Sequence, residues 1–405
     1  MPRTTLPSPP NLARDGWGVI FAQGGDPAVA EALRPLLEHR RQQAGADRYR
    51  ELRGGDGYRA GETKLDFLAR HGVAPGPPQP DRMPANLLLV GNAEAIAFDF
   101  QFQLALQHRV GRLDFDDPES YHRYGQRVIA AETEGSTSCP HGLLVAPRNP
   151  EDGVTERIVD LLVNPLAQSL LDDTFELLIA ETATKERLLR ALENRPELLF
   201  LAGHGLRLSA DDPRQRQRQG ALLCQDWPGP RRARGEVPDE QIFAAEDVPE
   251  DAPRMVFHFG CYSAGTPCRD GFDHLAGGDS PPLASRPFVA ALPRRFLELG
   301  SLAVVGHVER TWGWSFLWPG AGSQRGVFEL LLDELLAGAT IGQAMAAFAR
   351  RHGELASELL LLLEERERGL PVDQDRLVGL WTATADARRF IILGDPAARL
   401  FSPRV

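Results

Sequence analysis

Cysteine is scarce in this chain, whose 405 residues include only Cys139, Cys224, Cys261 and Cys268. So few and so scattered cysteines exclude a disulfide framework, and we expect free thiols in a reducing compartment, where a thiol can be chemically active. Long apolar runs are also missing. No segment approaches the roughly 20 apolar residues that span a bilayer, and the amino-terminal segment lacks the apolar core of a signal peptide. We therefore expect a cytoplasmic protein that does not associate with membranes.

An excess of basic residues is absent as well. The formal net charge is -11, which argues against direct binding of nucleic acid or of an anionic membrane. No strand-like segment is followed by a GxGxxG or Walker sequence. The loose glycine turn GGDPAVAEA (24–32) leaves a nucleotide-binding module only as a weak alternative. The composition, 42% hydrophobic and 25% charged, is that of a soluble globular protein with room for two or three domains.

What the chain does contain is a regular alternation of apolar strands and helices. Expected strands lie at 17–23, 87–91, 110–115, 142–147, 175–181, 198–203, 255–260, 301–308 and 389–395. Expected helices lie at 26–44, 118–132, 155–167, 185–194, 287–300, within 323–353 and at 354–368. Strands that are apolar throughout and alternate with helices predict an α/β fold with a mostly parallel central sheet and helices on both faces. The segment 135–140 is a plausible boundary between two subdomains, 1–135 and 136–405.

A long polar segment separates two of these strands. It carries arginine-rich clusters at 214–218 and 231–234 around the short apolar piece GALLCQDW (220–227). Loops of this length in compact domains are usually functional or disordered. A solvated hairpin with flexible arms is the alternative, and the sequence leaves both open.

The strands on either side of this segment each run into a reactive side chain flanked by glycine. In LFLAGHG (199–205) the apolar run is followed by His204 between two glycines, and MVFHFGCYSAG (255–265) places Cys261 at the matching position. If the two strands are parallel neighbours, both side chains reach one crevice, where the imidazole can take the thiol proton. The N–H groups of Gly205 and Cys261 can then hold the oxygen of a tetrahedral intermediate. A structural histidine and an inert buried cysteine remain the alternative.

These motifs resemble those of the clan CD cysteine peptidases, namely caspases, gingipains and bacterial caspase-like CHAT domains. The segment 87–132 resembles the one that precedes the gingipain catalytic half, and FIILGDPAARLF (390–401) resembles the LGDP-x-x-RL close of those domains. The resemblance covers about residues 85–401. It implies a caspase-like α/β sandwich of two subdomains, with 1–135 as the gingipain-like amino-terminal half and 136–405 as the catalytic one. It further implies a cysteine endopeptidase with His204 as general base and acid, Cys261 as nucleophile, and Gly205 with Cys261 as the oxyanion hole. No third catalytic residue is required, and the sequence nominates none.

The resemblance also bears on the S1 pocket, which takes the residue before the cleaved bond (P1). Arg/Lys-specific members often carry Asp two residues before the catalytic cysteine, where this chain has Phe259. By resemblance, Asp152 (or Glu151) is then the expected S1 acid, with Glu309 as a second acid and Trp312 and Trp314 as walls. This set predicts cleavage after Arg or Lys, because a carboxylate pairs with a guanidinium. Asp152 as a mere helix cap is the alternative.

A basic P1 preference would make the arginine-rich clusters candidate self-cleavage sites, with Arg218, Arg232 and Arg234 as the bonds concerned. The resemblance alone places such enzymes in bacterial antiviral defence or regulated death. It implies a protein or peptide substrate and activation by processing or by a protein partner. A catalytically inactive scaffold or effector-sensing module on the same fold is the alternative function.

Metals offer two weaker alternatives. The side chains of His258, Cys261, Cys268 and His274 have the ligand types of a zinc site, but their spacing matches no standard finger. The acidic loop residues Asp114, Asp116 and Asp117 are a candidate calcium site, for which a solvated turn is the simpler interpretation. We therefore expect no cofactor and no metal.

Overall fold

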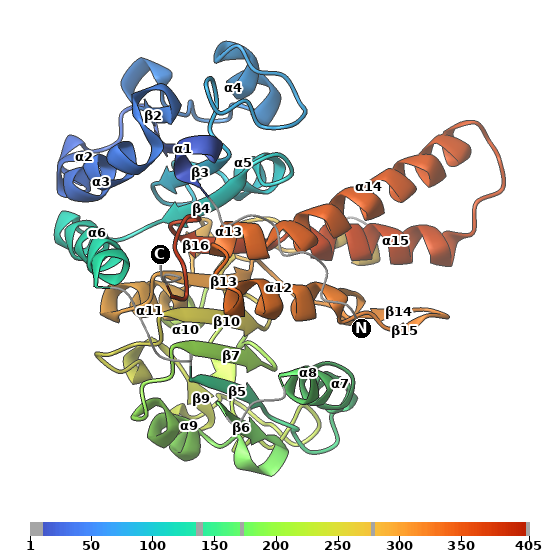
Figure 1. Cartoon of the computed structure of the whole chain (residues 1–405). Coiled ribbons are helices and arrows are strands. Elements are labelled where there is room, and N and C mark those ends of the chain that lie inside the picture. Colours follow the sequence, from blue (N-terminus) through green and yellow to red (C-terminus); the bar gives the residue numbers. More distant parts are fainter. Residues whose placement is uncertain (1–10, 135–140, 171–173, 277–279, 402–405) are drawn as a thin grey trace.

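The computed structural model describes residues 11–134, 141–170, 174–276 and 280–401. Its centre is a ten-stranded sheet in the order β2-β1-β3-β4-β16-β13-β10-β7-β5-β6 (Figure 1). Every neighbouring pair is parallel except β13 and β16. The strands are β1 (Trp17–Phe21), β2 (Tyr49–Leu52), β3 (Asn86–Val90), β4 (Arg109–Leu113), β5 (Gly142–Ala146), β6 (Phe175–Ile179), β7 (Leu198–Ala202), β10 (Met255–Phe259), β13 (Ala303–His307) and β16 (Phe390–Gly394).

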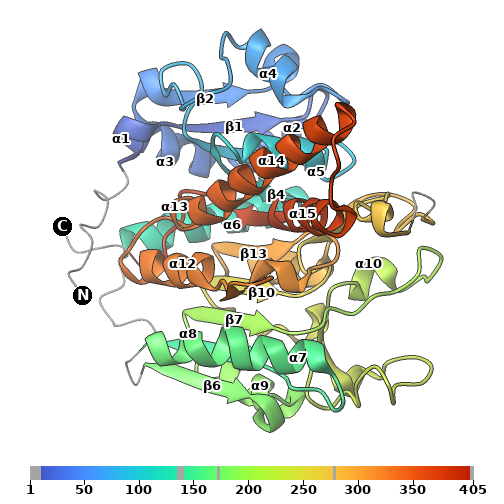
Figure 2. The ribbon, with the colours of Figure 1, turned by 90° about the vertical axis from the view of Figure 1, so that its right-hand side faces the viewer.

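Helices cover both faces of this sheet, which confirms the predicted α/β class. One face carries α3, α6 and α11, and the other carries α5, α8, α12, α13 and α14 (Figures 1 and 2). The helices are α1 (Leu12–Asp15), α2 (Pro27–Ala32), α3 (Arg34–Ala44), α4 (Lys64–Arg70), α5 (Phe98–Leu104), α6 (Pro118–Thr133), α7 (Gly153–Ile158), α8 (Asn164–Ser169), α9 (Lys185–Leu192), α10 (Gln215–Arg218), α11 (Ala291–Leu299), α12 (Gly326–Leu336), α13 (Ile341–Ala344), α14 (Ala346–Glu367) and α15 (Gln374–Ala387). A π-helical turn, Val159–Val163, joins α7 to α8. Because both faces are covered, the central strands are buried along their whole length, as expected for parallel strands.

The strands before residue 135 form one half of the sheet and those after 141 form the other. The halves meet where β4 pairs with β16, and a buried polar network reinforces this junction. Asp395, which follows β16, accepts hydrogen bonds from Trp17 Nε1 (3.0 Å) and Arg40 Nε (2.8 Å). Tyr124 Oη lies 2.6 Å from the Asp395 amide, which donates to it. The aspartate of the LGDP sequence therefore binds the carboxy-terminal strand to the amino-terminal half. The subdomain boundary itself stays a prediction, since 135–140 lies outside the described residues, as does Cys139.

Two parts extend beyond the sheet. Helices α14 and α15 pair as a long hairpin that projects from one face (Figure 1). The arginine-rich segment after β7 contains α10 and a short antiparallel pair, β8 (Leu222–Leu223) with β9 (Ile242–Phe243). This segment packs around its own small core. The hairpin expected there is present, and apolar residues on either side of it pack into the same core. No helix among the described residues is both long and apolar enough to cross a membrane.

Candidate active site

His204 and Cys261 stand at equivalent positions just past two adjacent central strands. β7 and β10 are parallel, with Leu198 opposite Met255 and Ala202 opposite Phe259. Continued by two residues, this register places His204 opposite Cys261. The backbones come so close that a Cβ on Gly205 would lie 1.9 Å from the Cys261 carbonyl oxygen. The structure therefore confirms that the two strands are neighbours, and it explains why glycine follows the histidine: any side chain there would collide with the cysteine backbone.

The turn after Cys261 is held in an unusual backbone conformation. Tyr262 has φ 59°, a left-handed value that is costly for a bulky residue. Its N–H donates to the Glu309 carbonyl (2.6 Å), and the Ala264 N–H donates to the His307 carbonyl (3.0 Å), so the end of β13 fixes the turn. Across the described chain, neither the Gly205 N–H nor the Cys261 N–H has an acceptor. Two free donors beside a thiol match the requirements of an oxyanion hole.

Asp152 contacts His204 rather than standing apart as an S1 acid. Its Oδ2 lies 2.7 Å from Nε2 of His204, and its carboxylate caps α7 by accepting from the N–H groups of Val154 and Thr155. Burial alone would raise the pKa of Asp152, but the bond to His204 and those of the helix turn hold it well below its ordinary value. The carboxylate expected to receive a substrate guanidinium is thus already paired. The alternative, that Asp152 caps the next helix, is confirmed. The same carboxylate also binds His204.

The remaining nitrogen of His204 is left free for proton transfer. If Nε2–H donates to Asp152, Nδ1 carries the lone pair, and Nδ1 has no hydrogen-bond partner in the described part of the chain. Burial raises the pKa of the Cys261 thiol, and hydrogen bonds with Thr311 offset part of this effect. The thiol sulfur lies 3.7 Å from Thr311 Oγ1. A thiol whose pKa is raised needs a base to become a nucleophile.

Two residues of the site carried no recognisable signal in the sequence. Trp227, from the arginine-rich segment, packs its ring edge-on against His204 with a centroid distance of 5.6 Å, and its indole N–H is buried without a partner among the described residues. Thr311 contacts the thiol from the loop after β13. A spacing argument could not find either one, because both come from irregular segments whose path depends on the rest of the fold.

Glu309, the second expected S1 acid, lies in a different environment. It is fully buried, has φ 81°, and accepts from the Gly271 N–H (2.9 Å). Arg389 Nε lies 3.5 Å from its carboxylate and Arg310 lies 3.4 Å away. This carboxylate belongs to an internal ion-pair network.

A cavity of about 380 Å³ is connected to the surroundings of Cys261 through Thr311. Thr311, which touches the thiol, forms one part of its wall, and Phe259 forms another. The expected walls Trp312 and Trp314 both line it. The other lining residues are Val154, Arg157, Ile158, Gly313, Phe316, Leu317, Trp318 and Pro319. None of the lining residues is acidic.

The remaining candidate residues have partners of their own. Arg218 pairs with Asp239 and Glu246, Arg232 pairs with Glu151, and Arg234 donates to nearby backbone carbonyls. Of the zinc candidates, His258 is buried inside β10 and His274 stacks on Trp381. Of the calcium candidates, Asp116 pairs with Arg294 and Asp117 caps α6. Within the described ranges, no three His, Cys, Asp or Glu residues form a metal-ligand group.

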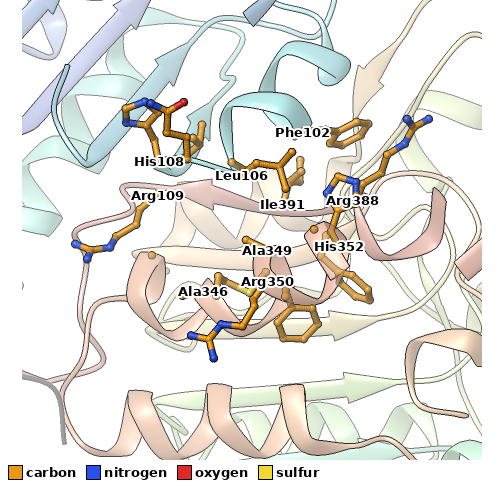
Figure 3. Close-up of a pocket in the computed structure, with 18 of the residues that line it drawn as sticks. Phe102, Leu106, His108, Arg109, Ala346, Ala349, Arg350, His352, Arg388 and Ile391 are labelled. Atoms are coloured by element: carbon orange, nitrogen blue, oxygen red, sulfur yellow. The ribbon is translucent and has the colours of Figure 1, made fainter. Parts of the chain in front are cut away.

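A second, larger cavity of about 540 Å³ lies between the amino-terminal half and the α14 side of the sheet. Side chains of α5, α14 and β16 surround it, among them Phe102, Ala349 and Ile391 (Figure 3). It also holds His108 and His352, whose pKa burial lowers to about 4. This cavity includes none of Asp152, His204 and Cys261 and, unlike the 380 Å³ cavity, it is not lined by Thr311, which contacts the thiol.

Known proteins resemble this chain in structure but do not match it in sequence. No protein-family model and no curated protein matches the sequence. Among solved structures, the Arg-specific cysteine proteinase gingipain R is similar, with a TM-score of 0.54 at 12% identity over 97% of this chain and 80% of that one. A complex of the pro- and mature domains of RgpB from Porphyromonas gingivalis matches with a TM-score of 0.52 at 13% identity, covering 96% and 81%. The chain therefore has the caspase-like fold of the clan CD cysteine peptidases, as the sequence motifs implied.

Proposed function

We propose that this protein is a cysteine endopeptidase in which Cys261 is the nucleophile, His204 the general base and acid, and Asp152 the residue that orients the histidine. The observation that carries the proposal is the series of contacts at the ends of β7 and β10. Asp152 binds one ring nitrogen of His204, the other has no hydrogen-bond partner among the described residues, and the thiol stands at the matching position of the adjacent strand. Similarity to gingipain R supports this at the level of the fold.

The chemistry follows from these groups. His204 Nδ1 takes the thiol proton while Sγ of Cys261 adds to the substrate carbonyl carbon, and the N–H groups of Gly205 and Cys261 hold the resulting oxyanion. When the C–N bond breaks, the imidazolium gives its proton to the departing amine. Water, deprotonated by His204, then attacks the thioester and releases the acid and the free thiol. Asp152 stabilises the imidazolium in both halves without itself accepting the proton.

Basic P1 specificity, an activating partner and a role in bacterial defence remain finer proposals. Cleavage after arginine is supported by similarity to a proteinase that is Arg-specific, and it would make self-processing at Arg218, Arg232 or Arg234 feasible. The two carboxylates expected to carry it, however, are bound to His204 and to Arg389. An inactive scaffold is the competing function, favoured by the absence of a hydrogen bond between His204 and Cys261 in the described structure.

Hydrolysis of an unbiased peptide library by the wild type, by Cys261→Ala and by His204→Ala tests the proposal. We expect the wild type to cleave internal peptide bonds, Cys261→Ala to be inactive, and His204→Ala to lose activity without losing the fold, as judged by circular dichroism. Equal cleavage by the wild type and Cys261→Ala would assign the activity to a contaminant. A folded wild type that cleaves nothing would favour the scaffold.

A further inference from the structure

The cavity beside Cys261 is enclosed largely by apolar side chains. Phe259, two residues before the nucleophile, is buried and packs its ring against Phe316 and Phe328 with centroid distances of 5.8 and 5.6 Å. Trp314 and Trp318 meet edge-to-face at 5.5 Å on the loop that follows β13. This aromatic wall offers a substrate side chain the burial of apolar surface, which is the main source of binding energy in such pockets.

The loop that forms this wall is held in place from behind. The backbone N–H of Trp312 donates to Oδ1 of Asp386 (2.9 Å), and the Ser315 hydroxyl donates to Oδ2 of the same carboxylate. Arg351 of α14 donates to the Trp314 carbonyl. Asp386 is fully buried and is not among the described residues that line the cavity, so its carboxylate does not face a ligand there.

The charged residue that lines the cavity is a cation. Arg157 of α7 is the one charged residue among those that line it, and in the described part of the chain it has no carboxylate partner. The same helix begins at Asp152, whose carboxylate points to His204 instead. An arginine or lysine entering here would lose water and meet no carboxylate among the described lining residues. Such an unpaired charge is strongly disfavoured in a desolvated site.

We propose that this cavity is the S1 pocket and that it selects a large apolar or aromatic P1 side chain, such as Phe or Leu, instead of a basic one. The proposal rests on the proposed peptidase activity and deepens it. Its position follows from Thr311, which touches both the thiol and the cavity. An acidic P1 is less favoured because Arg157 is exposed, and ion pairs in water contribute little. Self-cleavage after Arg218, Arg232 or Arg234 is then not a property of this enzyme.

The test uses peptides of one sequence that differ only at P1, with Phe, Leu, Arg, Lys and Asp. We expect kcat/KM for Phe or Leu to exceed that for Arg by about 100-fold or more, the size set by leaving a cation unpaired in the pocket. Val154→Asp then places a carboxylate in the cavity at an exposed helix position. This variant is expected to raise kcat/KM for Arg at least about tenfold and to lower that for Phe. Val154→Asn, of the same size without charge, is expected to gain no Arg cleavage.

The outcomes separate the two proposals. Preference for Arg over Phe in the wild type overturns the apolar S1 pocket and leaves the peptidase intact. Preference for Asp does the same and assigns the pocket to Arg157. If the wild type cleaves no member of the series, and neither a Phe nor an Arg acyloxymethyl ketone labels Cys261, the peptidase proposal fails and the pocket proposal fails with it. Should Val154→Asp not fold, Arg157→Gln serves in its place, with a smaller gain for Arg expected.

Discussion

Replacing Asp152 by Asn separates the two tasks of this side chain. Its Oδ1 accepts from the Val154 N–H (3.1 Å), while Oδ2 accepts from His204 Nε2 (2.7 Å) and the Thr155 hydroxyl (2.9 Å). Asn has one oxygen and is as good an N-cap as Asp. With its oxygen on the helix, its NH₂ group faces His204 and favours the tautomer whose Nε2 carries the lone pair. In that tautomer Nδ1 already carries a proton, so it cannot accept the proton of the Cys261 thiol.

The size of the effect follows from the loss of orientation. An Asp-to-Asn change in a Ser–His–Asp triad lowers kcat by about 10⁴. A thiol needs less help than a hydroxyl, so we expect a loss on the order of 10²–10⁴ in kcat, equal to about 3–5 kcal/mol. KM should change little, because Asp152 does not line the 380 Å³ cavity. Removal of the cap in Asp152→Ala should in addition lower the free energy of unfolding by about 1 kcal/mol.

Steady-state kinetics on the best P1 substrate, with urea unfolding of the same samples, measure both quantities. We expect Asp152→Asn to be nearly as stable as the wild type yet far less active. If Asp152→Asn keeps activity within a factor of two while Asp152→Ala loses only stability, then Asp152 is a helix cap and His204 needs no carboxylate.

Two further predictions concern the backbone contact and the junction of the two halves. In Gly205→Ala, the new Cβ would collide with the Cys261 carbonyl, so we expect at least about a 100-fold loss in kcat from displacement of an oxyanion donor. Gly153→Ala, whose Cβ would meet no atom within 4 Å, is the control, and similar kinetics for both variants would refute the close approach. Glu132 is mostly buried beside Arg40 at 2.7 Å; burial opposes ionisation, yet Arg40 and His39 bring its pKa to about 2 from 4.5. Because the folded pKa is lowered, the stabilisation of about 3 kcal/mol is present above pH 4.5 and is lost as the pH falls towards 2. Urea unfolding should therefore show a gap between wild type and Glu132→Gln that is large at pH 6 and shrinks towards pH 2.5, and a gap independent of pH would contradict the assignment.

The pattern of apolar residues in the sequence predicts the central strands well and the peripheral elements poorly. Apolar runs predicted nine of the sheet strands, because apolar residues fill the buried positions of a covered sheet. Even β6, which lies at the sheet edge and is only partly buried, has the mostly apolar sequence FELLI. Strand β2 was missed, since its sequence YREL lies at the sheet edge and is only partly buried. Helix α15 was missed as well. Its pairing with α14 is a tertiary contact, which local patterns do not encode.

The candidate site divides in the same way. His204 and Cys261 were identifiable because strand ends and glycines mark them in the sequence, and the parallel register brings them together. The contact of Asp152 with His204 was not predicted, because the sequence places Asp152 before a helix, as a cap or a pocket acid would be, and only the fold shows that it reaches the histidine. Glu309, the second expected pocket acid, has the right chemistry, but the fold buries it against Arg389, which the sequence did not indicate.

Direct detection of an acyl-enzyme tests the account most sharply. The wild type is mixed with a P1-Phe peptide ester, quenched in acid within the first turnover, and digested for mass spectrometry. We predict that the peptide containing Cys261 carries the acyl group as a thioester, that Asp152→Asn forms it more slowly, and that Cys261→Ala forms none. Turnover of the ester without any adduct on Cys261, or an adduct on another residue, would contradict the account.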